Sequence, residues 1–291
     1  MAEITAAAVK GLRDQTGAGM MDCKRVLRDA DGDVKRAVEL LRERGLARAG
    51  KREGRATSEG VIAIALDAGV GGMVELGCET DFVARTDDFR ALAEALASVL
   101  VADGSIDSVE ALLEGQVEGE KVADKMTAAI SKLGENVVLK RAVRLEVEGP
   151  GIAGGYVHAG AKLGVLVGLC TAASGPPVEG LAKDLAMHVA AADPSPLAVD
   201  RDGISPGLLE SERNIYRKQA EQEGKPEKVI DRIVEGKLGK FTAEVCLLEQ
   251  AFVKDPDRSI GDLLRDVGKE VDAEIAVSGF RRFKLGEASE E

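Results

Sequence analysis

The sequence predicts an α+β fold whose core is one unit used twice. Two strand-like runs, MVELGC at 73–78 and VLVGLC at 165–170, both end on a cysteine and both lead into a helical stripe of apolar residues. The stripes advance by the same steps: Phe89, Leu92, Leu96 and Leu100 in the first copy, and Val178, Leu181, Leu185 and Val189 in the second. Agreement of this kind indicates an internal repeat.

Further strand candidates flank each copy in the same order. The first copy lies between VIAIALD at 61–67 and VVLKRAVRLEV at 137–147, and the second between GGYVHAG at 154–160 and GFRRFKLGE at 279–287. We therefore predict two core subdomains, one over 59–148 and the other over 149–199 together with 240–291.

The two copies differ between the central strand and its helix. The stretch 78–89 is longer than 170–178, and the surplus falls in 80–85, where Phe82 lies off the stripe of the following helix. One interpretation is that Phe82 plugs the strand-to-helix corner, since most large apolar side chains are buried. The other, which we favour, is a displayed binding loop, because an insertion in one copy of a duplicated scaffold is typical of functional loops.

Residues 1–45 are expected to form a domain of three short helices. Their apolar stripes are Ile4, Ala8, Val9 and Leu12; Met20, Cys23, Val26 and Leu27; and Val34, Ala37, Val38 and Leu41. Gly17 and Gly19 break the first junction, 31–33 (Asp-Gly-Asp) breaks the second, and Gly45 occupies the position of a C-terminal cap. We expect one of Met20 and Met21 to be buried and the other exposed.

Residues 46–58 are expected to form a basic linker. Arg48, Lys51, Arg52 and Arg55 lie among glycines and alanines, and like charges of this kind keep a chain extended. Phosphate binding to RNA is the alternative interpretation. No aromatic residues are interleaved with the basic ones, however, and the whole chain carries a formal charge of −12, so the linker is favoured.

The first subdomain is predicted to contain a helix from Asp87 to about Val101, with Asp87 and Asp88 as its caps, and more helix between 105 and 133. In the second, His158 lies in a glycine-rich hairpin, where exposure and burial are equally favoured, and His188 is expected to be a packed histidine on its helix. The run at 241–252 has strand-like character.

Residues 200–239 form a charged insertion within the second unit. Sparse apolar residues lie on two arms around a turn at 223–226 (Glu-Gly-Lys-Pro), which predicts an antiparallel helical hairpin. Because narrow apolar seams bury little surface, the hairpin either leans on something, meets another copy of itself, or is simply solvated.

Composition limits the possible functions. No apolar run approaches the ~20 residues of a membrane span and the N-terminus lacks the order of a signal peptide, so a cytoplasmic protein is expected. The four cysteines, Cys23, Cys78, Cys170 and Cys246, are scattered without a CxxC or a histidine at ligand spacing, and predict no metal site, disulfide framework or cofactor. No nucleophile elbow, phosphate loop or Ser-His-Asp set is present, which favours a binding protein over an enzyme.

Five segments together resemble a known family. TGAGMMDCK at 16–24, TDFVA at 80–84, LGENVVLKR at 133–141, the YVHAGAKLGVLV segment and the closing GFRRF strand look like bacterial elongation factor Ts, in the same order over essentially the whole chain. The resemblance implies a ubiquitin-associated-like three-helix N-terminal domain, a duplicated α+β core with antiparallel sheets, and a dimerisation hairpin at 200–239. It also implies guanine-nucleotide exchange on elongation factor Tu.

The resemblance also assigns roles to residues. Asp81 and Phe82 would enter the GTPase near its magnesium site, with Thr80 and Val83 framing them. The matching N-terminal contact positions are Arg13, Met20, Met21 and Lys24, and the matching core positions are Leu133, Gly134 and His158. Family members commonly carry a further C-terminal helix that touches the GTPase, whereas the printed sequence ends at Glu291, just after the last predicted strand.

The implied partners are elongation factor Tu, in its GDP-bound and nucleotide-free forms, and a second copy of this chain. Neither a membrane nor a direct nucleic-acid contact is expected. The competing hypothesis is a ribosome- or RNA-associated binding factor that uses the basic linker, and steep loss of RNA binding with added salt would favour it.

Overall fold

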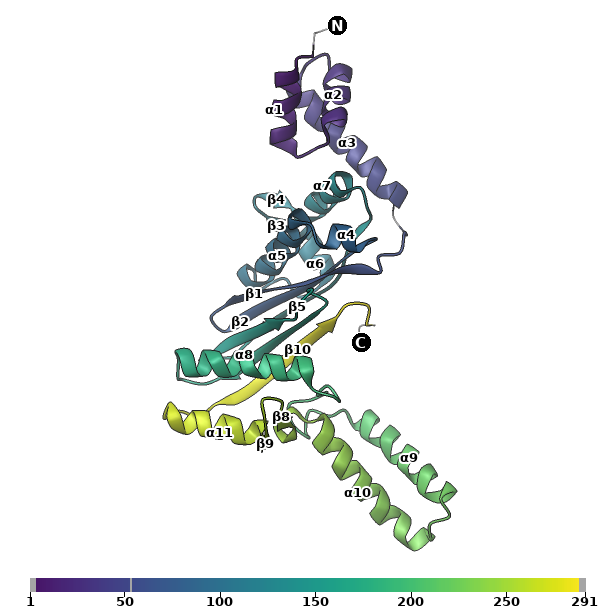
Figure 1. Ribbon diagram of the computed structural model, residues 1–291, viewed down its shortest axis with the longest axis vertical. Helices are drawn as coiled ribbons and strands as arrows, with labels where there is room; N and C mark the ends of the chain where they lie inside the picture. The colour runs from purple at the N-terminus through teal and green to yellow at the C-terminus, as the bar shows by residue number, and fades with distance from the viewer. Residues whose placement is uncertain (1–3, 53, 288–291) are drawn as a thin grey trace.

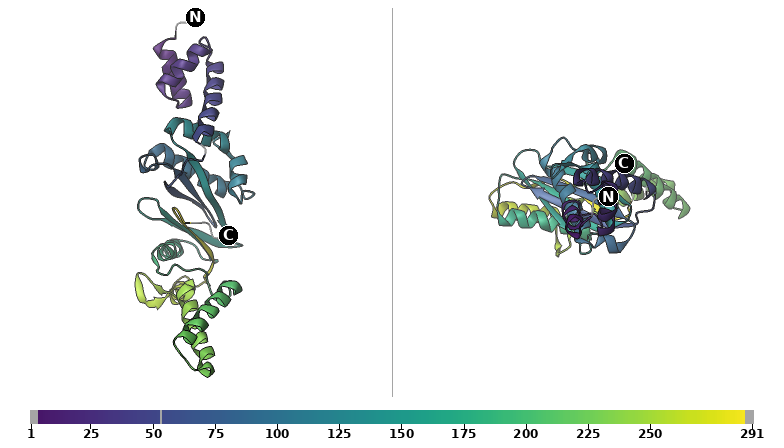
Figure 2. Two further views of the ribbon diagram at one scale, coloured as in Figure 1. Left: turned by 90° about the vertical axis from the view of Figure 1, so that its right-hand side faces the viewer. Right: turned by 90° about the horizontal axis from the view of Figure 1, so that it is seen from above.

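The computed structural model describes residues 4–52 and 54–287. Position 53 of the predicted linker and the two chain ends, 1–3 and 288–291, lie outside the described residues. The molecule is elongated, with the N-terminal helices at one end, a layered core in the middle and a helical hairpin projecting from the other end (Figures 1 and 2). Among the described residues no helix is long and apolar enough to cross a membrane.

The N-terminal domain consists of α1 (Ala6–Thr16), α2 (Met20–Asp29) and α3 (Val34–Arg52). Its core contains most of the predicted apolar stripes, but Met20 and Val34 are exposed and Ala30, outside the stripes, is buried. The buried residues are Val9, Leu12, Cys23, Val26, Leu27, Ala30 and Ala37. Thr5 caps α1 through its side chain, and Gly17 ends the helix in the left-handed conformation that glycine adopts without strain.

The predicted end of the third helix is wrong, and so is the extended conformation expected for the first part of the linker, 46–52. α3 continues through Gly45 to Arg52. Gly45 is buried against α7 (Val122–Leu133), where a Cβ atom would lie 3.8 Å from the Ser131 side chain. The low helix propensity of glycine is outweighed here by the close packing of the two helices. Arg42 also forms an ion pair with Asp124, which joins the N-terminal domain to the core.

The core contains two three-stranded antiparallel sheets, one from each predicted copy. The first has the order β1-β2-β5, and the second the order β6-β7-β10. Their bounds are β1 Glu59–Asp67, β2 Val70–Cys78, β5 Val137–Glu146, β6 Gly151–Val157, β7 Leu163–Cys170 and β10 Ala276–Lys284. The predicted flanking strands are therefore found on both sides of each central strand, and the α+β class is confirmed.

The sheets face each other and each carries a helix on its outer side (Figure 1). α5 (Asp87–Ala102) covers the first sheet and α8 (Pro176–Ala191) the second. All eight apolar residues of the two predicted stripes are buried beneath these helices. Thr86, rather than the predicted acids, caps α5, and Asp87 and Asp88 lie in its first turn, where carboxylates interact favourably with the helix dipole.

The remaining elements connect these layers. Along the chain, β2 and β5 are separated by α5 and α7 and also by α4 (Asp81–Ala84), α6 (Val109–Glu114), β3 (Gln116–Val117) and β4 (Glu120–Lys121). After α8 come α9 (Pro206–Gln222), α10 (Glu227–Val245), the 3-10 turn η1 (Leu247–Glu249), β8 (Ala251–Phe252), β9 (Asp255–Ser259) and α11 (Ile260–Glu270).

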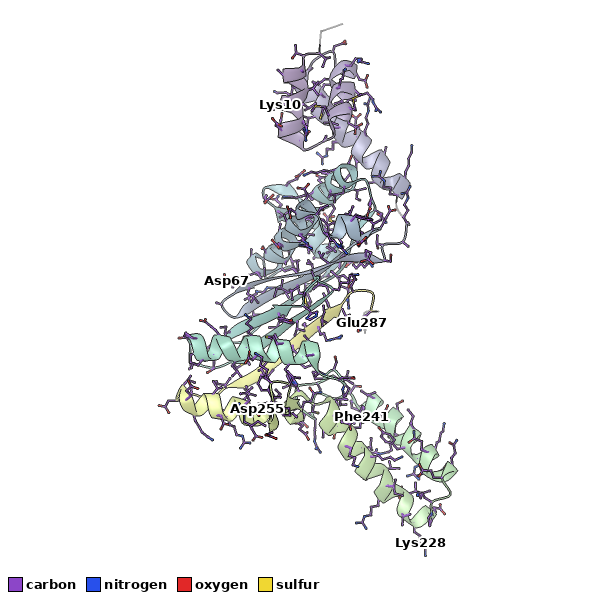
Figure 3. The ribbon with its side chains drawn as sticks, in the orientation of Figure 1. Lys10, Asp67, Lys228, Phe241, Asp255 and Glu287 are labelled. Atoms are coloured by element: carbon purple, nitrogen blue, oxygen red, sulfur yellow. The ribbon has the colours of Figure 1, made fainter. Side chains whose placement is uncertain are left out.

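Helices α9 and α10 form the hairpin, with Lys228 near its tip and Phe241 where it joins the core (Figure 3). The strand predicted from residue 241 is wrong, because α10 continues to Val245 and only Ala251–Phe252 is extended. The buried positions of α10 explain the difference, since Ile230, Val234, Leu238, Thr242 and Val245 recur at steps of four and three residues along one helix face.

An ion pair within the first sheet is linked to the second sheet through Arg141. Glu75 of β2 is only 1% exposed, and its carboxylate lies 2.5 Å from Nη2 of Arg141 on β5. The same nitrogen donates a hydrogen bond to the carbonyl oxygen of Lys284 on β10 at 2.8 Å, and the guanidinium stacks on Phe283 at 4.2 Å from the ring centroid. Arg141 therefore contacts three strands from both halves of the core.

His188 forms a second buried polar network, near the point where the hairpin joins the core. Its Nε2 atom lies 2.9 Å from Oε1 of Gln250, and the Val253 amide donates to Nδ1 at 3.3 Å. This arrangement assigns the neutral ring with the proton on Nε2. Gln250 in turn donates to the carbonyl oxygens of Pro194 and Glu244. The predicted packed histidine is confirmed.

Arg141→Ala should lower the free energy of unfolding by about 3 kcal/mol, because it leaves the Glu75 carboxylate buried without its main partner. Urea denaturation followed by circular dichroism measures the change. Arg217→Ala, which removes an ion pair with Asp231 on the surface of the hairpin, is the matched control and should change little. Equal effects of the two substitutions would contradict a stabilising role for the buried Glu75–Arg141 pair.

Stability should fall as the pH drops below about 6.5, because burial lowers the pKa of His188 in the folded state from its usual 6.5. Below that pH the unfolded chain binds the proton more readily than the folded one, so protonation favours unfolding. Denaturation between pH 5 and pH 7.5 tests this. His188→Gln should flatten the dependence over the upper part of this range, and an unchanged dependence in that variant would contradict the role of His188.

Candidate functional site

The segment predicted as a loop is a single helical turn. Thr80 is the N-cap of α4, and its hydroxyl accepts a hydrogen bond from the Val83 amide at 3.4 Å. The prediction of an irregular loop is therefore corrected, while its location is retained: the surplus residues of the first copy form α4, and the corresponding segment of the second copy contains no helix.

Phe82 projects into solvent from this turn. Its side chain is 80% exposed, whereas Val83 and Ala84 beside it are buried. The strand-to-helix corner is thus filled by these two smaller residues, and the interpretation of Phe82 as a corner plug is wrong. Burying a side chain of this size contributes about 1.5–3 kcal/mol of free energy, and the free protein does not gain this contribution from Phe82.

Residues 135 and 136, which are far from the turn in sequence, hold it in place through hydrogen bonds. The Glu135 carboxylate accepts from the Thr80 amide at 2.9 Å and from the Thr80 hydroxyl at 2.5 Å. In return, the Asn136 amide donates to Glu79 at 2.7 Å. This hydrogen bond, together with nearby Arg55, lowers the pKa of Glu79 and keeps it ionised.

Asp81 is more loosely held than the residues around it. Its carboxylate lies 2.9 Å from Nη2 of Arg85, one turn further along; the Arg85 side chain is largely exposed and that of Asp81 partly so. An exposed pair of this kind contributes little to stability, so the carboxylate can change partners at low cost. α4 therefore presents an aromatic ring and a carboxylate side by side.

The floor of the site is apolar. Cys78 is fully buried below the turn, and its thiol donates to the Thr80 carbonyl oxygen at 3.2 Å. Burial raises the pKa of Cys78 to about 11, which keeps the thiol protonated and uncharged at neutral pH.

The other predicted core positions lie near α4. Leu133 is half-buried at the end of α7, and Gly134 caps that helix with a φ of 82° immediately before the bracing Glu135. His158 is exposed in the turn between β6 and β7, with its Nδ1 2.9 Å from the Tyr156 hydroxyl.

The turn that carries His158 adjoins the same end of the first sheet. Lys162, in this turn, lies 2.8 Å from Glu59 of β1, and Glu59 pairs with Cys78, the residue from which the chain leaves β2 towards α4. The core positions are therefore gathered around one end of the first sheet.

The predicted N-terminal positions lie apart from this group, on the three-helix domain (Figure 1). Arg13 and Lys24 are exposed. The expectation that one methionine is buried is wrong, because Met20 is 47% exposed and Met21 67% exposed. Both follow the Gly17–Gly19 turn at the start of α2, and the α2 core is filled instead by Cys23, Val26 and Leu27.

The bracing residues were not predicted from the sequence. Glu135 and Asn136 come 55 and 57 residues after the groups they bind, and no local pattern links them. The available signals were their place directly after a helix-ending glycine and within the LGENVVLKR segment at 133–141. Across residues 4–52 and 54–287, no group of three His, Cys, Asp or Glu side chains is arranged to hold a metal ion.

The fold and the site define a class of protein that displays an aromatic side chain from a duplicated α+β core. The profile of a family described as Elongation factor TS matches residues 79–287. Proteins named Elongation factor Ts are similar over nearly the whole chain: one from Clostridium perfringens (strain SM101 / Type A) is 45% identical over 99% of this chain and 94% of its own length, and one from Chlorobium phaeobacteroides (strain BS1) is 46% identical over 98% and 100%. A third, from Maricaulis maris (strain MCS10), is 42% identical over 100% and 94%. The chain belongs to the elongation factor Ts family.

Cys78 should resist alkylation in the folded protein. At pH 8 a thiol with a pKa of about 11 is roughly one part in a thousand thiolate, and the side chain is also inaccessible. Iodoacetamide labelling followed by peptide mass spectrometry tests this, with the partly exposed Cys170 as the internal control. Labelling of Cys78 as fast as Cys170 would show that the floor beneath α4 opens readily.

Proposed function

We propose that this chain is a guanine-nucleotide exchange factor for elongation factor Tu, which promotes GDP release by disturbing the Mg²⁺ and phosphate site with the Asp81–Phe82 turn. The observation that carries the proposal is the 80% exposure of Phe82 on a braced turn. Membership of the elongation factor Ts family supports the identity of the partner. The site of action would be the cytoplasm, and no chemical reaction is catalysed on a substrate.

The chemistry of the partner's metal explains why a small disturbance is enough. Mg²⁺ demands near-octahedral oxygen ligands and bridges protein groups to the nucleotide phosphates. In this proposal Phe82 enters between packed elements of the partner and shifts them, while Asp81 competes for the groups that hold the metal and its waters. Thr80 and Val83 frame the pair, and loss of ligand geometry at the metal weakens the hold on GDP.

The exchange must be reversible by nucleotide. Since coupling between two binding sites is reciprocal, GDP or GTP weakens the binding of the factor by the same ratio as the factor weakens the binding of nucleotide. The incoming nucleotide then releases the factor, which acts again. Burial of the exposed Phe82 ring on the partner supplies part of the binding free energy that opposes the nucleotide.

Secondary contacts would extend along the same molecule. We assign Arg13, Met20, Met21 and Lys24 to contacts made by the N-terminal domain. Leu133, Gly134 and His158 are assigned to contacts around the α4 end of the core. The exposed thioethers of Met20 and Met21 support this, because flexible apolar side chains at a surface adapt well to a partner.

We also propose a homodimer formed through the hairpin at 200–239. Ile215 on α9 and Val229 on α10 are exposed large apolar residues, although the seam between the two helices buries Ala220, Ile230, Val234 and Leu238. The alternative of a solvated hairpin would leave these two side chains uncovered.

RNA binding by the basic segment is less well supported. Two of its side chains already have partners within the molecule: Arg52 donates to the Ile130 carbonyl oxygen at 2.9 Å, and Arg55 pairs with Glu79. These pairs reduce the positive charge that is free to attract phosphates.

Phe82→Ala should reduce acceleration of GDP release by roughly ten- to a hundred-fold, which is the range for an aromatic residue that dominates a contact. Because the ring is exposed, the free energy of unfolding should change by less than about 0.5 kcal/mol. Release of fluorescent GDP from purified elongation factor Tu, measured with the parent and with the variant, is the test.

Leu66→Ala is the matched control for this substitution. Leu66 is another exposed apolar residue, 44% accessible, at the opposite end of β1 from α4. The Leu66→Ala variant should accelerate GDP release as much as the parent does. No acceleration by the parent would overturn the proposed function, and equal activities of the parent and Phe82→Ala would overturn the role of the ring.

A further inference from the structure

α4 lacks the residue that normally closes the start of a helix. In a capping box the third helical residue is Glu or Gln, and its side chain binds the amide of the N-cap residue. That position in α4 is Val83, whose side chain is buried in the core below the turn. The Thr80 amide must therefore find its acceptor elsewhere.

Glu135 supplies the missing acceptor from another part of the chain. One carboxylate oxygen binds the Thr80 amide at 2.9 Å, and the other binds the Thr80 hydroxyl at 2.5 Å. Both donors of Thr80 are thus held by a single charged side chain, and hydrogen bonds to a charged acceptor are stronger than neutral ones. The hydroxyl, fixed in this way, keeps its lone pair directed at the Val83 amide.

Glu135 is itself held in place by contacts of the residues on either side of it. It lies between Gly134, the C-cap of α7, and Asn136, whose amide and side chain bind Glu79 and the Arg55 carbonyl oxygen. The carboxylate therefore has a defined position relative to the first sheet. Through its hydrogen bonds to Thr80, Glu135 fixes where α4 lies relative to that sheet.

The orientation of Phe82 depends on this contact. A helix of four residues is far below the length that is stable alone in water, and Phe82 is too exposed to be fixed by packing of its own ring. The buried Val83 and Ala84 side chains hold the turn together with hydrogen bonds at the two ends of α4, including that from the Thr86 hydroxyl to the Val83 carbonyl oxygen at 2.8 Å.

We propose that Glu135 is a positioning residue that fixes the α4 turn and so directs Phe82 toward the partner. This inference rests on the proposed exchange function and assigns it a residue outside the displayed turn. Glu135 acts through Thr80 and need not touch the partner.

The first test measures the order of α4 in the free protein. Glu135→Ala should increase hydrogen exchange of the Val83, Ala84 and Arg85 amides by roughly five-fold, as expected for loss of a helix cap, while the rest of the core keeps its protection. Glu114→Ala, which removes an exposed ion pair with Lys121 in the same subdomain, is the control and should change nothing in α4. Unchanged exchange in Glu135→Ala would overturn the inference.

The second test measures GDP release from elongation factor Tu. Glu135→Ala should reduce the acceleration of GDP release roughly five-fold. Glu135→Gln should keep most of the parent's activity, because its side-chain amide can accept from the Thr80 backbone amide and donate to the Thr80 hydroxyl oxygen. In a Phe82→Ala background, Glu135→Ala should cause no further loss. Additive losses would show that Glu135 contacts the partner directly and would overturn the positioning role.

Two features keep these outcomes separable. Hydrogen exchange needs no partner, so it decides the effect on α4 even where the parent fails to accelerate GDP release, a result that would overturn the proposed function. Where Glu135→Ala loses its fold, Glu135→Asp, which shortens the side chain by one methylene group and draws the carboxylate away from Thr80, is measured in its place.

Discussion

A helical turn of four residues cannot maintain itself in water, so everything that α4 does depends on the groups that hold its first residue. Nucleating a helix orders several backbone dihedrals for very few hydrogen bonds, and α4 adds no further turns to compensate. Its stability comes from burial of Val83 and Ala84 and from the Glu135 carboxylate at Thr80. Phe82 remains exposed because the two residues after it already fill the corner.

The duplicated core provides the rigid base for this turn. Two sheets packed face to face, covered mainly by α5 and α8, fix the ends of β2 and α5 between which α4 is inserted. The Arg141 guanidinium, in contact with Glu75, Phe283 and the Lys284 carbonyl oxygen, joins the two copies across their interface. A duplicated scaffold with an insertion in one copy thus separates the stable part of the molecule from the part that meets a partner.

Sequence patterns predicted the parts of the structure that depend on local periodicity. The two matched stripes identified α5 and α8 and the strands around them, and the length difference identified the site that became α4. The errors at Gly45 and at 241–245 arose where packing between elements outweighed local preference, since α7 accepts the glycine and one helix face of α10 continues through Thr242. Glu135 was missed for a similar reason, because its partner is 55 residues away in sequence.

The equilibrium coupling between this protein and GDP on elongation factor Tu tests the central claim most directly. It is obtained from the dissociation constants of the protein for the nucleotide-free and the GDP-bound partner, measured for the parent and for Phe82→Ala. If the preorganised ring drives exchange, the parent binds the nucleotide-free form much more tightly, and removal of the ring narrows the difference between the two constants. An identical ratio of constants for both proteins would contradict the account, because binding would then be coupled to nucleotide without the displayed ring.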